Sequence, residues 1–197
     1  MSSLKREIFA FLLGILFGGF FSYSFIPGRL DHDHSENADD KYHIHADFLI
    51  QVEDNTIDFG QAELMTTATN ERHKHAHLHD DEGEVLHMHE ENITFVEFLN
   101  SLDVELSESC LTVQKEEFCT NDNKSIKLYV NDEMWGGAIK DYVPKDLDRI
   151  LLFYGTESTP LTQTYLDKVS DEACLYSGSC PERGIAPPES CGLTCEL

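Results

Sequence analysis

The clearest pattern in the chain is an alternation of apolar and polar residues between His43 and Val52, which Leu49 alone interrupts. The apolar side chains occupy the even positions of this segment, whereas histidines and Asp47 occupy odd positions. A period of two is typical of a β-strand with one buried face. We expect residues 56–59 to form a short partner strand, because Asn55 favours a turn and Gly60 interrupts the pattern.

A second pair of alternating segments, residues 73–79 and 85–89, predicts a β-hairpin. A three-residue loop ending at Gly83 would place that glycine in the left-handed conformation that such hairpins need. His77 then faces His87, and apolar residues face apolar residues. A slip of one residue would mix the two faces, so the pattern and the turn predict the same register.

The remaining elements complete an α+β fold. The capping box Thr94-Phe-Val-Glu97 predicts a helix from Phe95 to about Leu102. Residues 126–130 and 149–154 are expected to be strands, and the second is apolar on both faces, which is typical of a central strand. We therefore predict a β-grasp-like mixed β-sheet with one principal helix on one face. The opposite face would be open, with the histidines projecting from it.

The N-terminal segment predicts a membrane anchor. Lys5 and Arg6 precede Ile8–Ile26, nineteen residues without a charge, which is long enough to span a bilayer as an uncleaved signal anchor. The basic residues place the N-terminus in the cytoplasm and the rest of the chain outside. The alternative is a secretory signal cleaved after Ser24, which also exports the domain. Small residues at every fourth position would allow a homodimer through this helix.

These patterns divide the chain into five parts. They are a cytoplasmic stub (1–7), the transmembrane signal anchor (8–26), an acidic linker (27–41), a histidine-rich β domain (42–157), and a short helix with a disulfide-stapled tail (158–197).

The amino-acid composition excludes some classes of function. The 197 residues include 14 basic and 37 acidic side chains, a net charge of −23, which excludes electrostatic binding of nucleic acid. Six cysteines in an exported chain predict disulfides rather than dithiol chemistry, because no C-x-x-C motif is present. A hairpin turning at residues 114–115 would set Cys110 opposite Cys119. Three connectivities remain open for the tail cysteines Cys174, Cys180, Cys191 and Cys195.

All ten histidines occur in H-x-H spacing, which places both rings on one face of a strand. A solvated strand face would normally carry Thr, Lys or Glu instead. Neutral imidazole suits copper and zinc, and neighbouring strands bring such rings together. His32 and His34 lie in the linker. The candidate metal ligands are His43, His45, Asp47, His73, His75, His77, His79, His87 and His89.

The sequence thus predicts a membrane-anchored, extracytoplasmic protein that binds copper or zinc for capture, buffering or delivery. One alternative is a metalloenzyme with three histidine ligands and a bound water. Another is an acidic interaction module with pH-sensing histidines, which would dock a protein partner through its acidic surface or the loop at Trp135. No hydrolase, cupin or phosphate-binding motif fits, so no catalytic residue is assigned.

Several motifs also resemble a known family. They are Lys41-Tyr-His-Ile-His-Ala-Asp-Phe, His77-Leu-His-Asp with Val85-Leu-His-Met-His, Leu147-Asp-Arg-Ile-Leu, Cys180-Pro-Glu-Arg-Gly and Cys191-Gly-Leu-Thr-Cys195. Over about residues 41 to 195 the chain is similar to an essentially uncharacterised family of small, membrane-anchored, histidine-rich exported proteins. Some members carry an automatic disulfide-isomerase label. The resemblance implies no catalytic residues.

Overall fold

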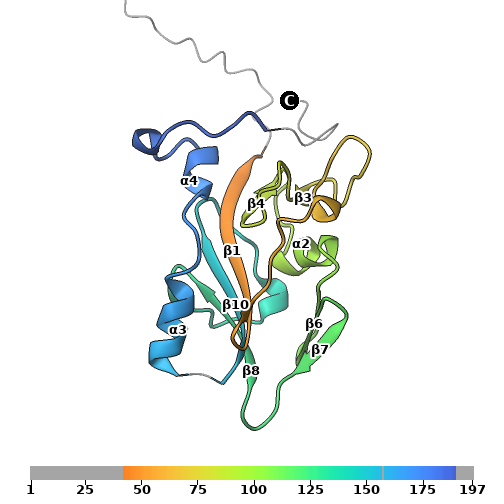
Figure 1. Ribbon diagram of the computed structural model, residues 1–197, viewed down its shortest axis with the longest axis vertical. Helices are drawn as coiled ribbons and strands as arrows, with labels where there is room; N and C mark the ends of the chain where they lie inside the picture. The colour runs from red at the N-terminus through yellow and green to blue at the C-terminus, as the bar shows by residue number, and fades with distance from the viewer. Residues whose placement is uncertain (1–41, 157, 190–197) are drawn as a thin grey trace, which may run out of the picture. The chain divides into compact units, whose positions relative to one another are not determined.

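The computed structural model describes residues 42–156 and 158–189, which form a mixed α+β fold (Figure 1). The larger sheet has the strand order β3-β4-β1-β10-β8-β9, with β2 paired to β1. Its strands are β1 (Ile44–Val52), β2 (Asn55–Thr56), β3 (Ala76–His77), β4 (Val85–Met88), β8 (Ser125–Val130), β9 (Glu133–Met134) and β10 (Arg149–Gly155). A smaller sheet contains β5 (Glu105–Leu106), β6 (Cys110–Val113) and β7 (Glu116–Cys119).

The α-helices are α2 (Phe95–Ser101), α3 (Thr159–Leu166) and α4 (Ala173–Tyr176), and short 3₁₀ turns occur at Ala62–Leu64, Ile139–Asp141 and Pro181–Arg183. The predicted capping box begins α2: the Glu97 amide donates to Thr94 Oγ1 at 3.2 Å, and the Thr94 amide donates to Glu97 Oε2 at 2.7 Å. Each bond satisfies a backbone donor that a helix N-terminus would otherwise leave unpaired.

The centre of the sheet is a parallel pair. β1 and β10 run parallel, and β4 and β8 flank them in antiparallel pairings. The even positions of β1 from Ala46 to Val52 are buried, as the alternation predicted, and Phe48 packs edge-to-face on Phe98 of α2 at 5.0 Å. β10 is buried on both faces and lies between two strands, which confirms its expected central place. The partner strand expected at residues 56–59 is shorter and begins at Asn55.

The opposite face of the sheet is covered, so the expectation of an open histidine face was wrong. Figure 1 shows α3 and α4 on the side of β1 and β10 away from α2. Tyr165 and Leu166 of α3 form a second hydrophobic cluster with Leu151 and Phe153. α4 contacts β1 directly. The alternation in β1 therefore separates two buried environments, one apolar and one with polar ligands, rather than inside from outside.

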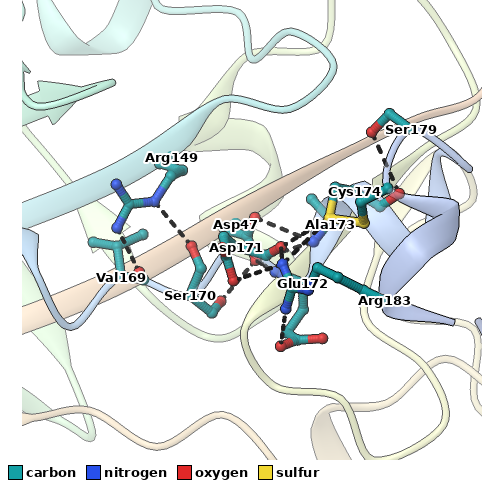
Figure 2. A network of polar contacts seen from close by, with 11 residues as sticks. Asp47, Arg149, Val169, Ser170, Asp171, Glu172, Ala173, Cys174, Ser179 and Arg183 are labelled. Atoms are coloured by element: carbon teal, nitrogen blue, oxygen red, sulfur yellow. Dashed lines mark hydrogen bonds and ion pairs between the residues drawn. A yellow bond between two sulfur atoms is a disulfide. The ribbon is translucent and has the colours of Figure 1, made fainter.

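Asp47 explains how the segment before α4 is fastened to this face (Figure 2). Its buried carboxylate accepts hydrogen bonds from the Ser170 hydroxyl at 2.7 Å and from the amides of Glu172 at 2.8 Å and Ala173 at 3.1 Å. Arg149 adds bonds to the carbonyl oxygens of the same segment. Because a buried carboxylate needs such donors, Asp47 holds the tail in one position over β1.

The hairpin of β3 and β4 has the predicted register, but its turn differs from the predicted one. His77 pairs with His87 and Ala76 with Met88, as expected. However, Asp80 and Asp81 occupy the left-handed region with φ of 57° and 61°, and Gly83 does not. Gly83 is instead required by close packing, because a Cβ atom there would overlap the Gly60 nitrogen. The facing of apolar and polar residues fixed the register more strongly than the turn type.

Two disulfides lie within the described residues. Cys110 and Cys119 face each other across β6 and β7 and are bridged, which confirms the expected pair. Cys174 is bonded to Cys180, enclosing the end of α4 in a short loop. Cys191 and Cys195 lie outside the described residues.

The predicted signal anchor (8–26) and acidic linker (27–41) also lie outside the described residues. Within residues 42–156 and 158–189, no helix has both the length and the apolar character needed to cross a membrane.

We predict that Gly83→Ala destabilises the domain by about 1–3 kcal/mol, the usual cost of overpacking. The new Cβ atom would lie 2.6 Å from the carbonyl carbon of Phe59, and backbone cannot move aside as a side chain can. Gly136→Ala is the matched control, because nothing lies within 4 Å of the place that its new methyl group would take. Urea unfolding measures both changes. Equal midpoints for the two variants would contradict the close packing of this loop.

Candidate metal centre

Six histidines gather on the covered face of the sheet. β3, β4 and β1 are neighbours, and their register places His77, His87 and His45 side by side in one row. The H-x-H spacing adds a second ring on the same face from each segment: His43 precedes β1, while His79 and His89 follow β3 and β4.

The six rings close a circle, which we call the histidine ring. The distances between neighbouring ring centres are 4.5 Å (His43–His45), 4.7 Å (His45–His87), 3.8 Å (His87–His79), 5.9 Å (His79–His77), 5.1 Å (His77–His89) and 4.4 Å (His89–His43). Four members are almost fully buried: His45, His77, His79 and His87.

Glu189 brings a carboxylate from the C-terminal segment to this ring. Its Oε1 atom lies 3.2 Å from His45 Nε2, and its Oε2 atom lies 3.2 Å from His43 Nε2. The same Oε2 atom is 3.8 Å from His79 Nε2 and 3.9 Å from His87 Nδ1. Burial favours the neutral acid, but the close approach of His43 and His45 holds the pKa of Glu189 well below its usual range. One charged carboxylate thus faces four imidazoles.

The protonation of His45 is set by a chain of hydrogen bonds. The Ser177 hydroxyl donates to Asp146 Oδ1 at 2.6 Å, so toward His45 Nδ1, 3.0 Å away, the same oxygen is an acceptor. His45 Nδ1 therefore carries a proton and donates it. In the neutral ring, Nε2 then has a lone pair directed at Glu189, another acceptor. A cation between them, either a second proton on His45 or a metal ion, resolves this conflict.

His77 and His79 also carry their ring proton on Nδ1, because of hydrogen bonds to other groups. His77 Nδ1 lies 3.0 Å from the carbonyl oxygen of His73, which can only accept a hydrogen bond. His79 Nδ1 lies 2.8 Å from Asp80 Oδ2, a carboxylate–histidine pair like those that orient metal ligands. In both rings the proton is on Nδ1, so Nε2 presents a lone pair.

Several of these nitrogen atoms form no hydrogen bond within the described residues. His77 Nε2, His79 Nε2 and both nitrogens of His87 are buried and lack a hydrogen-bond partner there. A buried polar atom without a partner costs about 1–3 kcal/mol. So many buried nitrogen atoms without a hydrogen-bond partner are uncommon in a purely structural cluster.

Protonation is unfavourable for several of the rings inside the cluster, among them His77, His87 and His89. Burial, with repulsion from the neighbouring rings, lowers the pKa of His77 to about 4 and that of His89 to about 3. The pKa of His87 lies well below its ordinary value for the same reasons. The structure thus keeps metal-ligating imidazoles in the form that binds a metal.

The distances fit a metal ion. Two ligand atoms on one tetrahedral zinc, each about 2.0–2.1 Å from the ion, stand roughly 3.4 Å apart. Ligand atoms of His43, His45, His87 and Glu189 all lie within 4.8 Å of one another. A second cluster, at Cys110, Glu117 and Cys119, meets the same distance test, but its sulfur atoms form a disulfide and provide no thiolate.

Three of the predicted ligands lie outside the ring. The Asp47 carboxylate accepts hydrogen bonds from the segment before α4. His73 Nδ1 accepts from the amides of His75 and Ala76, so it shapes the turn into β3. His75 is half-buried and pairs with Glu90 at 3.1 Å.

The tail residues of the site were not predicted from the sequence. Glu189, Ser177 and Tyr176 are remote in sequence from the histidines, and Tyr176 packs on both His45 and His87. Asp146 was missed for the same reason. No periodicity or spacing marks these residues, because only the return of the chain over the sheet brings them to the ring.

Comparison with known proteins gives no independent assignment. The chain matches no family model, and no curated protein or solved structure matches it. The geometry of the histidine ring is therefore the basis for assigning a function.

Proposed function

We propose that this protein binds a transition-metal ion, copper or zinc, in the histidine ring and serves in metal capture, buffering or delivery. The observation that carries the proposal is the set of buried imidazole nitrogens that have no hydrogen-bond partner among the described residues and that surround the half-buried carboxylate of Glu189. A cation at this point would satisfy the lone pairs and the charge together.

The donor set favours a borderline transition metal. Imidazole nitrogen suits copper and zinc, whereas calcium and magnesium prefer oxygen ligands. His43, His45, His87 and Glu189 together supply the four ligands of a tetrahedral ion. The net charge of −23 further lowers the cost of bringing a cation to the protein.

A binding role accounts for this ligand set better than catalysis. A catalytic zinc usually keeps one position open for water, but the four groups here leave none open on a tetrahedral ion. Two of the ligands, His45 and His87, are also shielded from solvent. Both features favour holding an ion over processing a substrate.

We further propose that the domain is exported and tethered by the segment 8–26, with residues 27–41 as a solvated spacer. Outside the cytoplasm, disulfides such as Cys110–Cys119 persist. The hairpin, helix and central parallel pair also support a β-grasp-like scaffold, in which strands of the sheet and the tail build the site.

We predict that His87→Leu weakens metal binding but leaves the metal-free protein as stable as before, or more so. His87 has no hydrogen-bond partner among the described residues, so an apolar side chain of similar size removes only an unsatisfied group. The loss of affinity should exceed the roughly 10- to 100-fold typical of a lost second-sphere partner. Calorimetric titration of the full chain with Zn(II) and Cu(II) measures the affinity, and urea unfolding with a chelator measures stability.

His75→Leu is the matched control, because His75 lies outside the ring and pairs with Glu90. We expect its metal affinity to be unchanged. Unaltered affinity in His87→Leu, or a metal-free variant that is strongly destabilised, would argue that the ring has a structural role only.

We also predict that the metal-free protein loses stability as the pH falls below about 6.5. Burial lowers the pKa of His77 to about 4, so the folded chain leaves this ring neutral while the unfolded chain protonates it. Stability from this group is complete above about pH 6.5 and is lost as the pH falls toward about 4, with a slope of up to about 1.4 kcal/mol per pH unit.

Urea unfolding with a chelator at about pH 7.5, 6 and 5 measures this slope. His77→Asn is the control variant, because it keeps a donor near the His73 carbonyl but cannot titrate, so its slope should be smaller. Identical slopes for the two proteins would contradict a buried neutral His77.

A further inference from the structure

The histidine ring offers more ligands than one ion can use. A tetrahedral ion takes four ligands, and His43, His45, His87 and Glu189 already supply four. His77, His79 and His89 remain, all on the same covered face. A single ion would leave these three rings without a metal, although His77 and His79 are fully buried.

His77 lies at distances from His79 and from His89 that suit a shared ion. Two imidazoles bound to one zinc, with Zn–N bonds of about 2.0–2.1 Å, have ring centres roughly 5 Å apart. The centre of the His77 ring lies 5.9 Å from that of His79 and 5.1 Å from that of His89. Two of the three pairs in the second set therefore have ring spacings close to that of imidazoles on a shared ion.

Two of these rings are already oriented as ligands. The bonds from His77 Nδ1 to the His73 carbonyl and from His79 Nδ1 to Asp80 leave both Nε2 atoms with lone pairs. Neither Nε2 atom has a hydrogen-bond partner within the described residues. If the site held one ion only, these atoms would stay buried and unsatisfied.

We propose that the histidine ring binds two metal ions, the first at His43, His45, His87 and Glu189 and the second at His77, His79 and His89. This inference rests on the proposed function. Glu189 lies between the two sets, because its Oε2 atom is 3.2 Å from His43 Nε2 and 3.8 Å from His79 Nε2. A carboxylate in that place offsets the repulsion between ions that stand about 3.5–4 Å apart in two-metal sites.

The two ions should differ in affinity. The ligand atoms of the first set are gathered within 4.8 Å, whereas those of His77, His79 and His89 do not all lie within that distance. A preorganised site binds more tightly, since less conformational freedom is lost on binding. Binding should therefore occur in two steps, with the first set filled first.

The test is the number of ions bound by the full chain, counted by native mass spectrometry after chelator treatment and titration with Zn(II). We expect two ions in the wild-type protein. His77→Asn keeps a donor to the His73 carbonyl and lacks the Nε2 atom, so we expect it to bind one. His75→Asn changes a histidine outside the ring and should still bind two.

Each other outcome has a definite meaning. One ion in the wild-type protein overturns the second site and leaves the proposed function standing, whereas no ion overturns both. Two ions in the wild-type protein and also in His77→Asn would place the second ion elsewhere and likewise overturn the inference.

A second measurement does not depend on the folding of any variant. Two Cu(II) ions a few ångströms apart couple magnetically, so the electron paramagnetic resonance signal of the wild-type protein loaded with two equivalents should fall well below twice that at one equivalent. A signal that doubles would show two distant ions and contradict a shared ring.

Discussion

The structure depends on one constraint: six imidazole rings are gathered together, four of them almost fully buried, and most of their nitrogen atoms must find a partner. Hydrogen bonds to Ser177, Asp80 and the His73 carbonyl satisfy one side of three rings. The inner nitrogens are left facing Glu189 and one another. Buried lone pairs repel each other and repel a carboxylate, so a cation at this point would stabilise the interior.

The rest of the fold serves that arrangement. The parallel pair β1–β10 gives a rigid base, and β4 and β3 continue it so that the histidines stand in a row. On the other face, α2 and the phenylalanines form an apolar core that fixes the register of the strands. Because a slip of one residue would exchange the two faces, the same packing that stabilises the domain also positions the ligands.

The C-terminal segment completes the site from above the sheet. Asp47 anchors it at one end, and the Cys174–Cys180 bond restrains the loop that carries Ser177. Glu189 then reaches the ring from beyond this loop. A carboxylate that would be costly alone in such a place is stabilised by the histidines, and it would in turn compensate the charge of an ion bound there.

The sequence by itself determined the strands, the capped helix, the Cys110–Cys119 bridge and the histidine register, because each depends on local periodicity or on one hairpin. Only the tertiary structure decided that the histidine face is covered, that Asp47 holds the tail and that Glu189 joins the ring. Those outcomes depend on contacts across more than a hundred residues. Local patterns carry no information about such contacts, since a buried polar face and a solvated one alternate with the same period.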